Sequence, residues 1–255
     1  MNNSLIYVIV FLLCFGAAAE GMTAAEEIAA AEESGKPQLT LDGGIYLSSA
    51  YLWRGAANCG FHVQPDMALH YKGFTFEAYG YFSLDNTFKE IDLELQYRYK
   101  DLDIHLLDCF CYCSGYKNPE NYFDWSKETG NHFVELAVCY VPQKYPFYAK
   151  WFTFFYGDFL PGKNGKKGAP SFSSYLELEA HHTFGRICTG SVIVGSSILK
   201  GAYTSYTKDF AVIHCELRAF REIRLQHVSI PLTVSFVVNP YSKLSYLGAS
   251  AGIRF

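Results

Sequence analysis

The feature that most constrains this chain is a two-residue hydrophobic period that recurs from residue 39 to the C-terminus. In a β-strand successive side chains point to opposite faces, so this period gives each strand one oily and one polar face. The segments 61–71, 91–99 and 172–184 show it most clearly, with mostly aliphatic or aromatic residues at one parity. The other parity carries mostly His, Gln, Asp, Glu or Arg, joined in 172–184 by Ser173, Tyr175 and Thr183. The pattern predicts long strands with two chemically different faces.

The connections between these strands alternate in length. Short connections are expected at 71–73, 100–101, 142–146, 184–186 and 220–223, and long ones at 114–130, 158–171 and 199–208. Bacterial outer-membrane barrels have tight turns on the periplasmic side and longer loops outside. We therefore predict an all-β fold over residues 39–255, a transmembrane antiparallel up-and-down β-barrel of about 12 strands. With an even number of strands, the first strand would begin and the last strand would end on the periplasmic side.

A soluble β-sandwich or lipocalin-like barrel is the competing fold, and it would bury the oily face. Two observations favour the membrane barrel. The strands are about ten to twelve residues long, which is enough for a tilted strand to cross a bilayer. The polar face is heavily charged, and a sandwich core could not bury it without pairing every charge. After residue 19, no run approaches the roughly 18 apolar residues that a spanning helix needs.

The N-terminus indicates export. Residues 5–15 form an apolar segment of signal-peptide length and residues 17–19 are small, so residues 1–19 are predicted to be a cleaved signal peptide. Residues 1–4 carry no Lys or Arg, which leaves a retained anchor as the alternative. Residues 20–38 are rich in Ala and Glu without a large apolar face, and we predict a periplasmic N-terminal extension there. A lumen plug or a partner-binding helix is the alternative for that segment.

The last strand has a characteristic ending. Residues 244–255 alternate to a terminal aromatic, Phe255. This ending is similar to the C-terminal strand signature that outer-membrane barrels present to their assembly machinery. We therefore expect that machinery as a partner during biogenesis, the alternative being an edge strand that ends on Phe by chance.

The first strands resemble a known family. Residues 48–55, Ser-Ser-Ala-Tyr-Leu-Trp-Arg-Gly, followed by Gln64 and by Gly73, are similar to the first hairpin of the TorF-type porins. That family shows Ser, an acidic residue, Tyr, two further residues, Arg and Gly near the outer end of the first strand, and here Ala50 stands in place of the acidic residue. The resemblance covers this first hairpin and implies an outer-membrane porin.

The polar face is predicted to line a polar lumen. The residues expected to set its charge are Arg54, Glu77, Asp92, Glu94, Arg98, Lys150, Glu177, Glu179, Glu216 and Arg218, together with Asp42. Their acidic excess predicts a mild preference for cations. Arg54 is either a selectivity residue or a rim partner for a lumen carboxylate.

Aromatic residues make up 17% of the chain and are expected at the bilayer interfaces, where rings with an apolar body and a polar tip are favoured. The predicted girdle residues are Tyr51, Trp53, Tyr97, Tyr99, Phe184 and Phe255. Tyr51 and Trp53 would share a face in the outer girdle. Arg54 would then point the other way, and Gly55 would let the chain turn into the loop.

We predict no metal site and no cofactor. Cys109, Cys111 and Cys113 are two residues apart, so their thiols would lie roughly 6.5 to 7 Å apart along one strand face. That spacing suits neither one tetrahedral zinc site nor a disulfide between neighbours, and we expect small lumen-facing residues. The seven cysteines after the signal peptide form an odd set, so at least one thiol should stay unpaired unless the chain pairs with another.

An outer-membrane enzyme acting on lipid or peptide is the second functional class. The chain has no Gly-x-Ser-x-Gly step. Glu177, Glu179 and His181 share one strand face and could form an acid–base set. An ion-pair ladder between these carboxylates and Lys150, Arg98 or Arg218 explains them with fewer assumptions, so we expect no catalysis.

The favoured function is a narrow porin-like channel for passive diffusion of small solutes, because about 12 strands lie between small filled barrels and the 16 to 18 strands of broad channels. An enzyme and a non-conducting structural or surface-binding barrel are the alternatives. Expected partners are outer-membrane lipid and lipopolysaccharide, whose phosphates Lys163, Lys166 and Lys167 could bind as point charges. The net charge of -4 does not favour nucleic acid. The loop 114–130 either narrows the channel or forms a binding surface, and the oligomeric state stays open.

Overall fold

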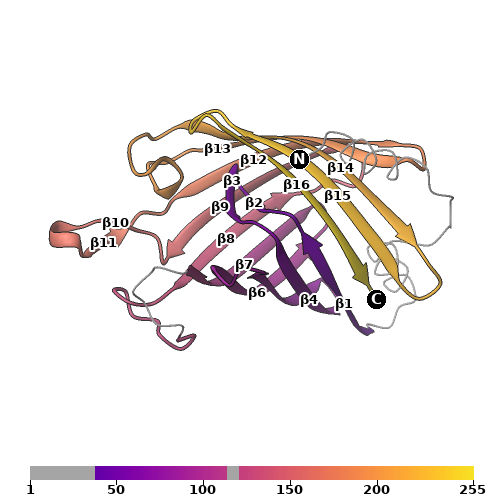
Figure 1. Ribbon diagram of the computed structural model, residues 1–255, viewed down its shortest axis with the longest axis horizontal. Helices are drawn as coiled ribbons and strands as arrows, with labels where there is room; N and C mark the ends of the chain where they lie inside the picture. The colour runs from indigo at the N-terminus through magenta and orange to yellow at the C-terminus, as the bar shows by residue number, and fades with distance from the viewer. Residues whose placement is uncertain (1–37, 114–120) are drawn as a thin grey trace.

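The structure is a computed structural model that describes residues 38–113 and 121–255. The predicted signal peptide and nearly all of the predicted extension lie outside these residues. Within the part that the structure describes, no helix is long and apolar enough to cross a membrane. The described chain forms one closed barrel of long strands and two short hairpins (Figure 1).

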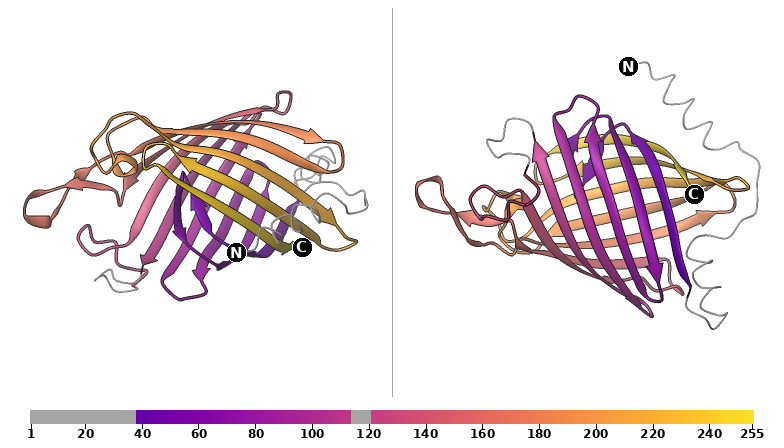
Figure 2. Two further views of the ribbon diagram at one scale, coloured as in Figure 1. Left: turned by 45° about the horizontal axis from the view of Figure 1, so that its top comes forward. Right: turned by 90° about the horizontal axis from the view of Figure 1, so that it is seen from below.

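The barrel strands are β1 (Leu39–Ser48), β4 (His62–Tyr71), β5 (Phe74–Ser83), β6 (Phe88–Tyr99), β7 (Leu102–Cys113), β8 (His132–Tyr140), β9 (Phe147–Tyr156), β12 (Ser174–Phe184), β13 (Cys188–Ser197), β14 (Ala211–Arg224), β15 (Ser229–Asn239) and β16 (Leu244–Arg254). Each pairs antiparallel with its neighbours in chain order, and β1 pairs with β16 to close the ring. The strands that form the wall are all tilted in the same direction relative to the barrel axis (Figure 2). The prediction of a 12-stranded antiparallel up-and-down barrel is confirmed.

One end of the barrel has only short connections, and the other end carries the long ones at 49–61, 114–131, 157–173 and 198–210. Two connections at this second end, 84–87 and 240–243, are also short. One predicted turn is wrong, because residues 220–223 continue β14 and pair with residues 230–233 of β15. The turn comes later, at 225–228, where the Leu225 N–H donates to the Val228 carbonyl at 2.8 Å. The charged pair Arg221 and Glu222 resembles a turn in the sequence, yet both residues belong to the strand ladder.

The burial of the strands is the reverse of that in a soluble β-protein. Leu95 of β6 and Leu178 of β12 point outward and are 46% and 47% exposed, whereas Asp92 and Glu179 point inward and are 2% and 7% exposed. A soluble sandwich would bury the leucines and expose the carboxylates. The arrangement therefore excludes the soluble alternative, and the outer face is one that a bilayer would cover.

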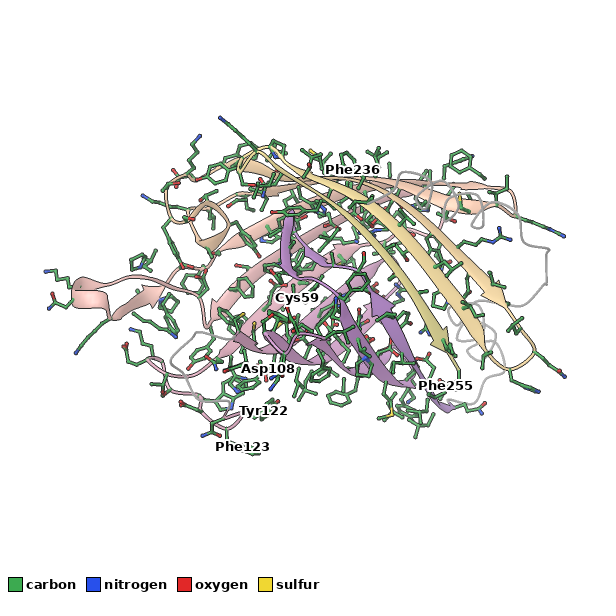
Figure 3. The ribbon with its side chains drawn as sticks, in the orientation of Figure 1. Cys59, Asp108, Tyr122, Phe123, Phe236 and Phe255 are labelled. Atoms are coloured by element: carbon green, nitrogen blue, oxygen red, sulfur yellow. The ribbon has the colours of Figure 1, made fainter. Side chains whose placement is uncertain are left out.

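Exposed aromatic side chains gather at the turn end of this outer face. Tyr97, Tyr99, Phe184 and Phe255 are between 39% and 72% exposed. Phe255 follows the end of β16, and Figure 3 shows it at the edge of the barrel. Their positions fit the predicted aromatic girdle on that side.

Candidate functional site

The lumen is crossed by the connection between β1 and β4. Within this connection β2 (Tyr51–Trp53) and β3 (Ala56–Cys59) pair as a short hairpin that folds back inside the barrel (Figure 1). We call residues 51–59 the lumen hairpin. Its residues contact inward-facing residues of β6, β8 and β15. The hairpin therefore spans the lumen near the loop end of the barrel.

Tyr51 fixes the start of the lumen hairpin. Its ring stacks on Tyr81 of β5 with 3.9 Å between the ring centres, and its hydroxyl donates to Glu90 of β6 at 2.6 Å. The rings of Tyr51 and Phe88 pack edge to face, with 5.6 Å between their centres. Tyr51 is therefore buried in the lumen, with 8% of its surface exposed.

The predicted place of Tyr51 and Trp53 in the outer aromatic girdle is wrong. Trp53 also lies inside the barrel, 6.3 Å from the ring of Phe154 and 5.8 Å from the ring of Tyr203. The prediction continued the two-residue period of β1 past Ser48, where that strand ends and the chain turns inward. The inward turn allows the two aromatic rings to pack on the lumen wall instead of on lipid.

Gly55 lets the tip of the lumen hairpin reach the opposite wall. Its φ is +81°, and a Cβ at this position would lie 1.9 Å from the carbonyl oxygen of Ile213 in β14. The side-chain amide of Asn239 in β15 donates to the Gly55 carbonyl at 3.1 Å. Glycine alone suits both the backbone conformation and the close approach. The tip is thus held against β14 and β15.

Arg54 makes the main electrostatic contact of the hairpin. Its guanidinium donates to the two carboxylate oxygens of Glu135 in β8 at 2.5 and 2.6 Å, and also to the hydroxyl of Tyr203. The side chains of Arg54 and Glu135 are only 8% and 3% exposed. A bidentate pair shielded from water in this way is strong, and either partner alone would be a buried, uncompensated charge.

Four aromatic rings surround the same guanidinium. Its central carbon lies 4.1 Å from the ring centre of Phe152, 4.7 Å from Trp53, 4.9 Å from Tyr175 and 5.7 Å from Tyr203. Rings at these distances attract a cation through their negative faces. Arg54 is therefore held by one carboxylate and a cage of rings, and three of the four rings belong to the barrel wall or its outer loop.

An ion-pair ladder lies on the turn side of the hairpin. Lys150 of β9 binds Glu177 at 3.0 Å and Glu179 at 3.3 Å, both on β12. Arg218 of β14 donates to the two oxygens of Glu216 at 2.8 and 3.0 Å. The predicted ion-pair ladder that includes Glu177 and Glu179 is therefore present, and Lys150 is the cation that binds both carboxylates.

The other predicted lumen residues also point inward but form separate groups. Glu94 contacts the ring of His105, and Arg98 binds Asp103 at 2.5 and 2.6 Å near the turn end. Further groups are Glu77 with Gln96, Asp42 with His70 and Arg254, and the almost fully buried Asp92. The lumen is therefore charged along its whole length, with its densest cluster between β8 and β14.

Two unfilled spaces border the lumen hairpin among the described residues. A cavity of about 450 Å³ lies on its turn side, bordered by Glu94, His105, Lys150 and others, and a smaller one of about 180 Å³ lies toward β1, β4, β15 and β16. Leu52 of the hairpin borders both cavities. The hairpin thus lies between these two spaces, and the one of about 450 Å³ is lined by residues of both charges.

Sequence reasoning missed several residues of this site. Glu135 and His214 have the inward parity of their strands, so the alternation could have found them. Tyr175 has the parity of the polar face in 172–184, which predicts no role for it; its hydroxyl donates to Glu177 at 2.9 Å and lies 2.7 Å from His214 Nδ1. Tyr203 comes from the irregular loop 198–210, where no periodicity marks it.

The described part of the loop 114–130 packs on the outer wall of the barrel and does not narrow the lumen. His132 lies 2.8 Å from Asp108 through Nδ1 and 2.5 Å from the Tyr122 carbonyl through Nε2. Trp125 stacks on the His132 ring at 3.7 Å. Asp108, Tyr122 and Phe123 are seen at this edge in Figure 3, and Phe123 is 84% exposed. Of the two alternatives for this loop, its described residues favour an external surface.

The connection 158–171 forms a second hairpin of β10 (Phe159–Pro161) and β11 (Lys167–Pro170), which projects beyond the loop end of the barrel (Figure 1). The ammonium groups of Lys127 and Lys167 both lie over the ring of Phe159, at 5.3 and 5.6 Å. Lys163 is exposed at its tip. The hairpin thus presents basic side chains outside the barrel.

The cysteines and the candidate acid–base set show no built catalytic centre. All seven cysteines of the described chain carry free thiols, and Cys109 borders the larger cavity. Within residues 38–113 and 121–255 no group of His, Cys, Asp or Glu is arranged to hold a metal ion. Glu177 and Glu179 bind Lys150, whereas His181 packs on the ring of Tyr148 at 4.7 Å.

No family model matches the chain, and no curated protein matches it in sequence. The resemblance to the TorF-type porins therefore stays a prediction. Similar solved structures include the KdgM porin, with 10% identity, a TM-score of 0.45 and coverage of 84% of this chain and 97% of that one. The NanC porin shows 10% identity and a TM-score of 0.46, covering 85% and 99%. The COG4313 outer membrane channel from Pseudomonas putida F1 shows 8% identity and a TM-score of 0.40, covering 84% and 94%.

Proposed function

We propose that the protein spans the outer membrane and lets small solutes cross it by diffusion, with a preference for cations. The observation that carries this proposal is a charged cavity of about 450 Å³ inside a closed barrel whose outer face is apolar. The lumen hairpin crosses the interior, so a diffusing solute would have to pass beside it. Small solutes are therefore the class that fits.

The cation preference follows from the charges that face the lumen. Carboxylates outnumber fixed cations there, and one of the cations, Arg54, is neutralised by Glu135. The lumen carboxylates are Asp42, Asp66, Glu77, Glu90, Asp92, Glu94, Asp103, Glu135, Glu177, Glu179, Glu216 and Glu222, and the Arg and Lys residues are Arg54, Arg98, Lys150, Arg218, Arg224 and Arg254. The excess of fixed negative charge along the lumen favours the entry of cations.

Arg54 acts in this proposal as a rim partner for a lumen carboxylate and not as a free selectivity residue. It is bound on one side by Glu135 and is enclosed by rings on the others. The charge of Arg54 is neutralised by Glu135. Arg54 would therefore affect solutes indirectly, by holding the lumen hairpin in place.

The lumen hairpin also favours a second candidate, a barrel that does not conduct. Tyr51, Arg54 and Gly55 fix it to three parts of the wall, so the interior would stay divided if the hairpin never moved. Such a barrel would serve through its outer loops, which carry the exposed Phe123 and the β10–β11 hairpin.

The expected partners and the route to the membrane belong to the same proposal. Residues 1–19 would direct export, and Phe255, which is 72% exposed, would be read by the barrel-assembly machinery. Outer-membrane lipid would cover the apolar wall. Lys163 and Lys166, exposed on the projecting hairpin, would meet lipopolysaccharide phosphates.

Single-channel recording on the refolded mature protein in planar bilayers tests the proposal. We expect discrete conductance steps and a reversal potential in a KCl gradient that indicates cations. The double variant Glu177→Gln with Glu179→Gln leaves Lys150 without its partners and should shift the reversal potential toward anions. Glu128→Gln, the same chemical change on an exposed loop, should leave it unchanged. If the folded wild-type barrel inserts and gives no steps, it is the non-conducting candidate.

A further inference from the structure

The site of Arg54 has the construction of a ligand site whose occupant is supplied by the protein itself. Glu135 lies on β8, Phe152 on β9, Tyr175 on β12 and Tyr203 on the loop before β14, whereas Arg54 arrives on the lumen hairpin. The carboxylate and two of the rings therefore belong to barrel strands and the third ring to an outer loop, and none of them belongs to the lumen hairpin. We call Glu135, Phe152, Tyr175 and Tyr203 the wall cage.

The wall cage selects for a guanidinium group in particular. Glu135 offers two oxygens at 2.5 and 2.6 Å to two parallel N–H groups, which is the fork geometry of guanidinium and not of an ammonium ion. The Phe152 ring centre is 4.1 Å from the guanidinium carbon, close enough for the planar cation to lie over the ring. The Tyr203 hydroxyl accepts a further hydrogen bond from the same group.

The wall cage is also held in shape without Arg54. Tyr175 is fully buried, and its hydroxyl is fixed by Glu177 at 2.9 Å and by His214 at 2.7 Å. A Cβ on Gly195 would lie 2.0 Å from that hydroxyl, so the ring rests directly on the β13 backbone. An empty cage would keep the Tyr175 ring in place, and Tyr203 would keep its stacking contact with Phe154 of the wall. It would leave Glu135, which is 3% exposed, without a counterion. Such a site favours the entry of another cation.

A solute can reach this site from within the barrel. Arg54, Glu135 and Phe152 all border the cavity of about 450 Å³. A guanidinium-bearing solute in that cavity would meet the outer edge of the Arg54–Glu135 pair and compete for the same two carboxylate oxygens. When it takes them, the tip of the lumen hairpin loses its main electrostatic contact with the wall.

We propose that the wall cage binds small solutes that carry a guanidinium group, in exchange for Arg54, and that this exchange releases the lumen hairpin. The proposal rests on the proposed channel function for its consequence, because release of the hairpin would widen the path. The binding step itself needs no conduction. The wall cage would define the class of solute to which the channel responds. The overall acidic charge of the lumen would not distinguish one cation from another.

Chemical rescue in detergent tests the binding step. The Arg54→Ala variant of the refolded mature protein should unfold at a lower temperature than the wild type, and millimolar methylguanidinium should restore most of the loss. Methylammonium, which has the charge without the fork, and methylurea, which has the shape without the charge, should restore little. Lys163→Ala, which removes an exposed cation outside the cage, should respond to none of the three.

The variants and the wild type separate the possible outcomes. In Arg54→Ala combined with Glu135→Gln, rescue should disappear, because the carboxylate is gone. If Arg54→Ala folds and methylguanidinium rescues it no better than methylammonium, the cage is not a guanidinium site and the proposal is overturned. If Arg54→Ala does not fold even with methylguanidinium present during refolding, the cage has failed to bind its ligand and the proposal is also overturned.

Planar-bilayer recording on the wild type tests the exchange. Methylguanidinium should raise the open probability by about tenfold over equimolar methylammonium. This factor corresponds to a difference of about 1.4 kcal/mol between the binding free energies of the two cations. Rescue in detergent together with an unchanged open probability would overturn the exchange while leaving the site. Rescue in a barrel that never conducts would instead remove the proposed channel function and leave guanidinium binding standing.

Discussion

Replacing Glu135 by Gln should free the lumen hairpin from the barrel wall. The substitution keeps the size of the side chain and removes its charge, so the guanidinium of Arg54 loses its counterion and keeps one oxygen acceptor in place of the two at 2.5 and 2.6 Å. The amide nitrogen of Gln would also place a donor against the donors of Arg54. The rings of Phe152 and Tyr175 remain, but they do not replace a carboxylate.

The expected magnitude follows from the burial of the pair. The two side chains are 8% and 3% exposed, so solvent screening reduces the interaction little. Removing one partner of such a buried pair costs about 3 to 5 kcal/mol. If the hairpin stays in the lumen, the free energy of unfolding should fall by this amount. If the hairpin leaves, its inserted population should fall by roughly 100-fold or more, since about 1.4 kcal/mol corresponds to a factor of ten.

Both outcomes are measurable on the same refolded variant. Urea unfolding in lipid vesicles gives the change in stability, and single-channel recording gives the change in conductance and open probability. The double variant Arg54→Met with Glu135→Gln removes both charges and should recover most of the stability, because no buried charge is left without a partner. Glu128→Gln on the outer loop serves as the matched control. Wild-type stability together with wild-type conductance in Glu135→Gln would refute the assigned role of the ion pair.

Three further changes test other parts of the structure. Gly55→Ala should displace the hairpin tip and raise the conductance, because φ is +81° and the new Cβ would lie 1.9 Å from the Ile213 carbonyl; an unchanged conductance trace would contradict the contact. Leu95→Arg on the outer wall should lower the stability in vesicles by about 2 to 4 kcal/mol, whereas Gln96→Arg on the lumen side should cost much less, and equal losses would show that the faces are assigned wrongly. Hydrogen bonds from Ser126 and Thr129 hold the pKa of the Asp124 carboxyl below its ordinary range. Its contribution to the order of the loop is therefore present above about pH 4 and lost as the pH falls through the lowered pKa, so pepsin should cut this loop faster at pH 2 than at pH 4 relative to a disordered peptide, and Asp124→Asn should abolish the difference.

Local pattern alone was enough to predict the wall of the barrel. The alternation in 91–99 placed Leu95 outside and Asp92 inside, and the structure confirms both. A one-residue shift would have exchanged every side chain between the two faces, so the register of such a strand is strongly specified by its own residues. The turn expected at 220–223 failed because charged residues there serve the strand ladder as well as they would serve a turn.

The same local pattern could not predict the lumen hairpin. Residues 51–53 read as a continuation of β1, and nothing in their sequence tells whether Tyr51 meets lipid or Tyr81. The decision depends on partners that are far away along the chain, namely Glu90, Glu135 and Ile213. Those partners come together only when the barrel has closed.

The sequence by itself therefore determined the strand faces, the strand number and the closed antiparallel wall, because each follows from a two-residue period and from connection lengths that are local properties. The tertiary structure decided what fills the interior. Arg54 could be assigned to the lumen from its parity, but the carboxylate and the rings that hold it come from β8, β9, β12 and the loop before β14. A buried charge is stable only where such distant groups converge, and that convergence is a property of the closed barrel alone.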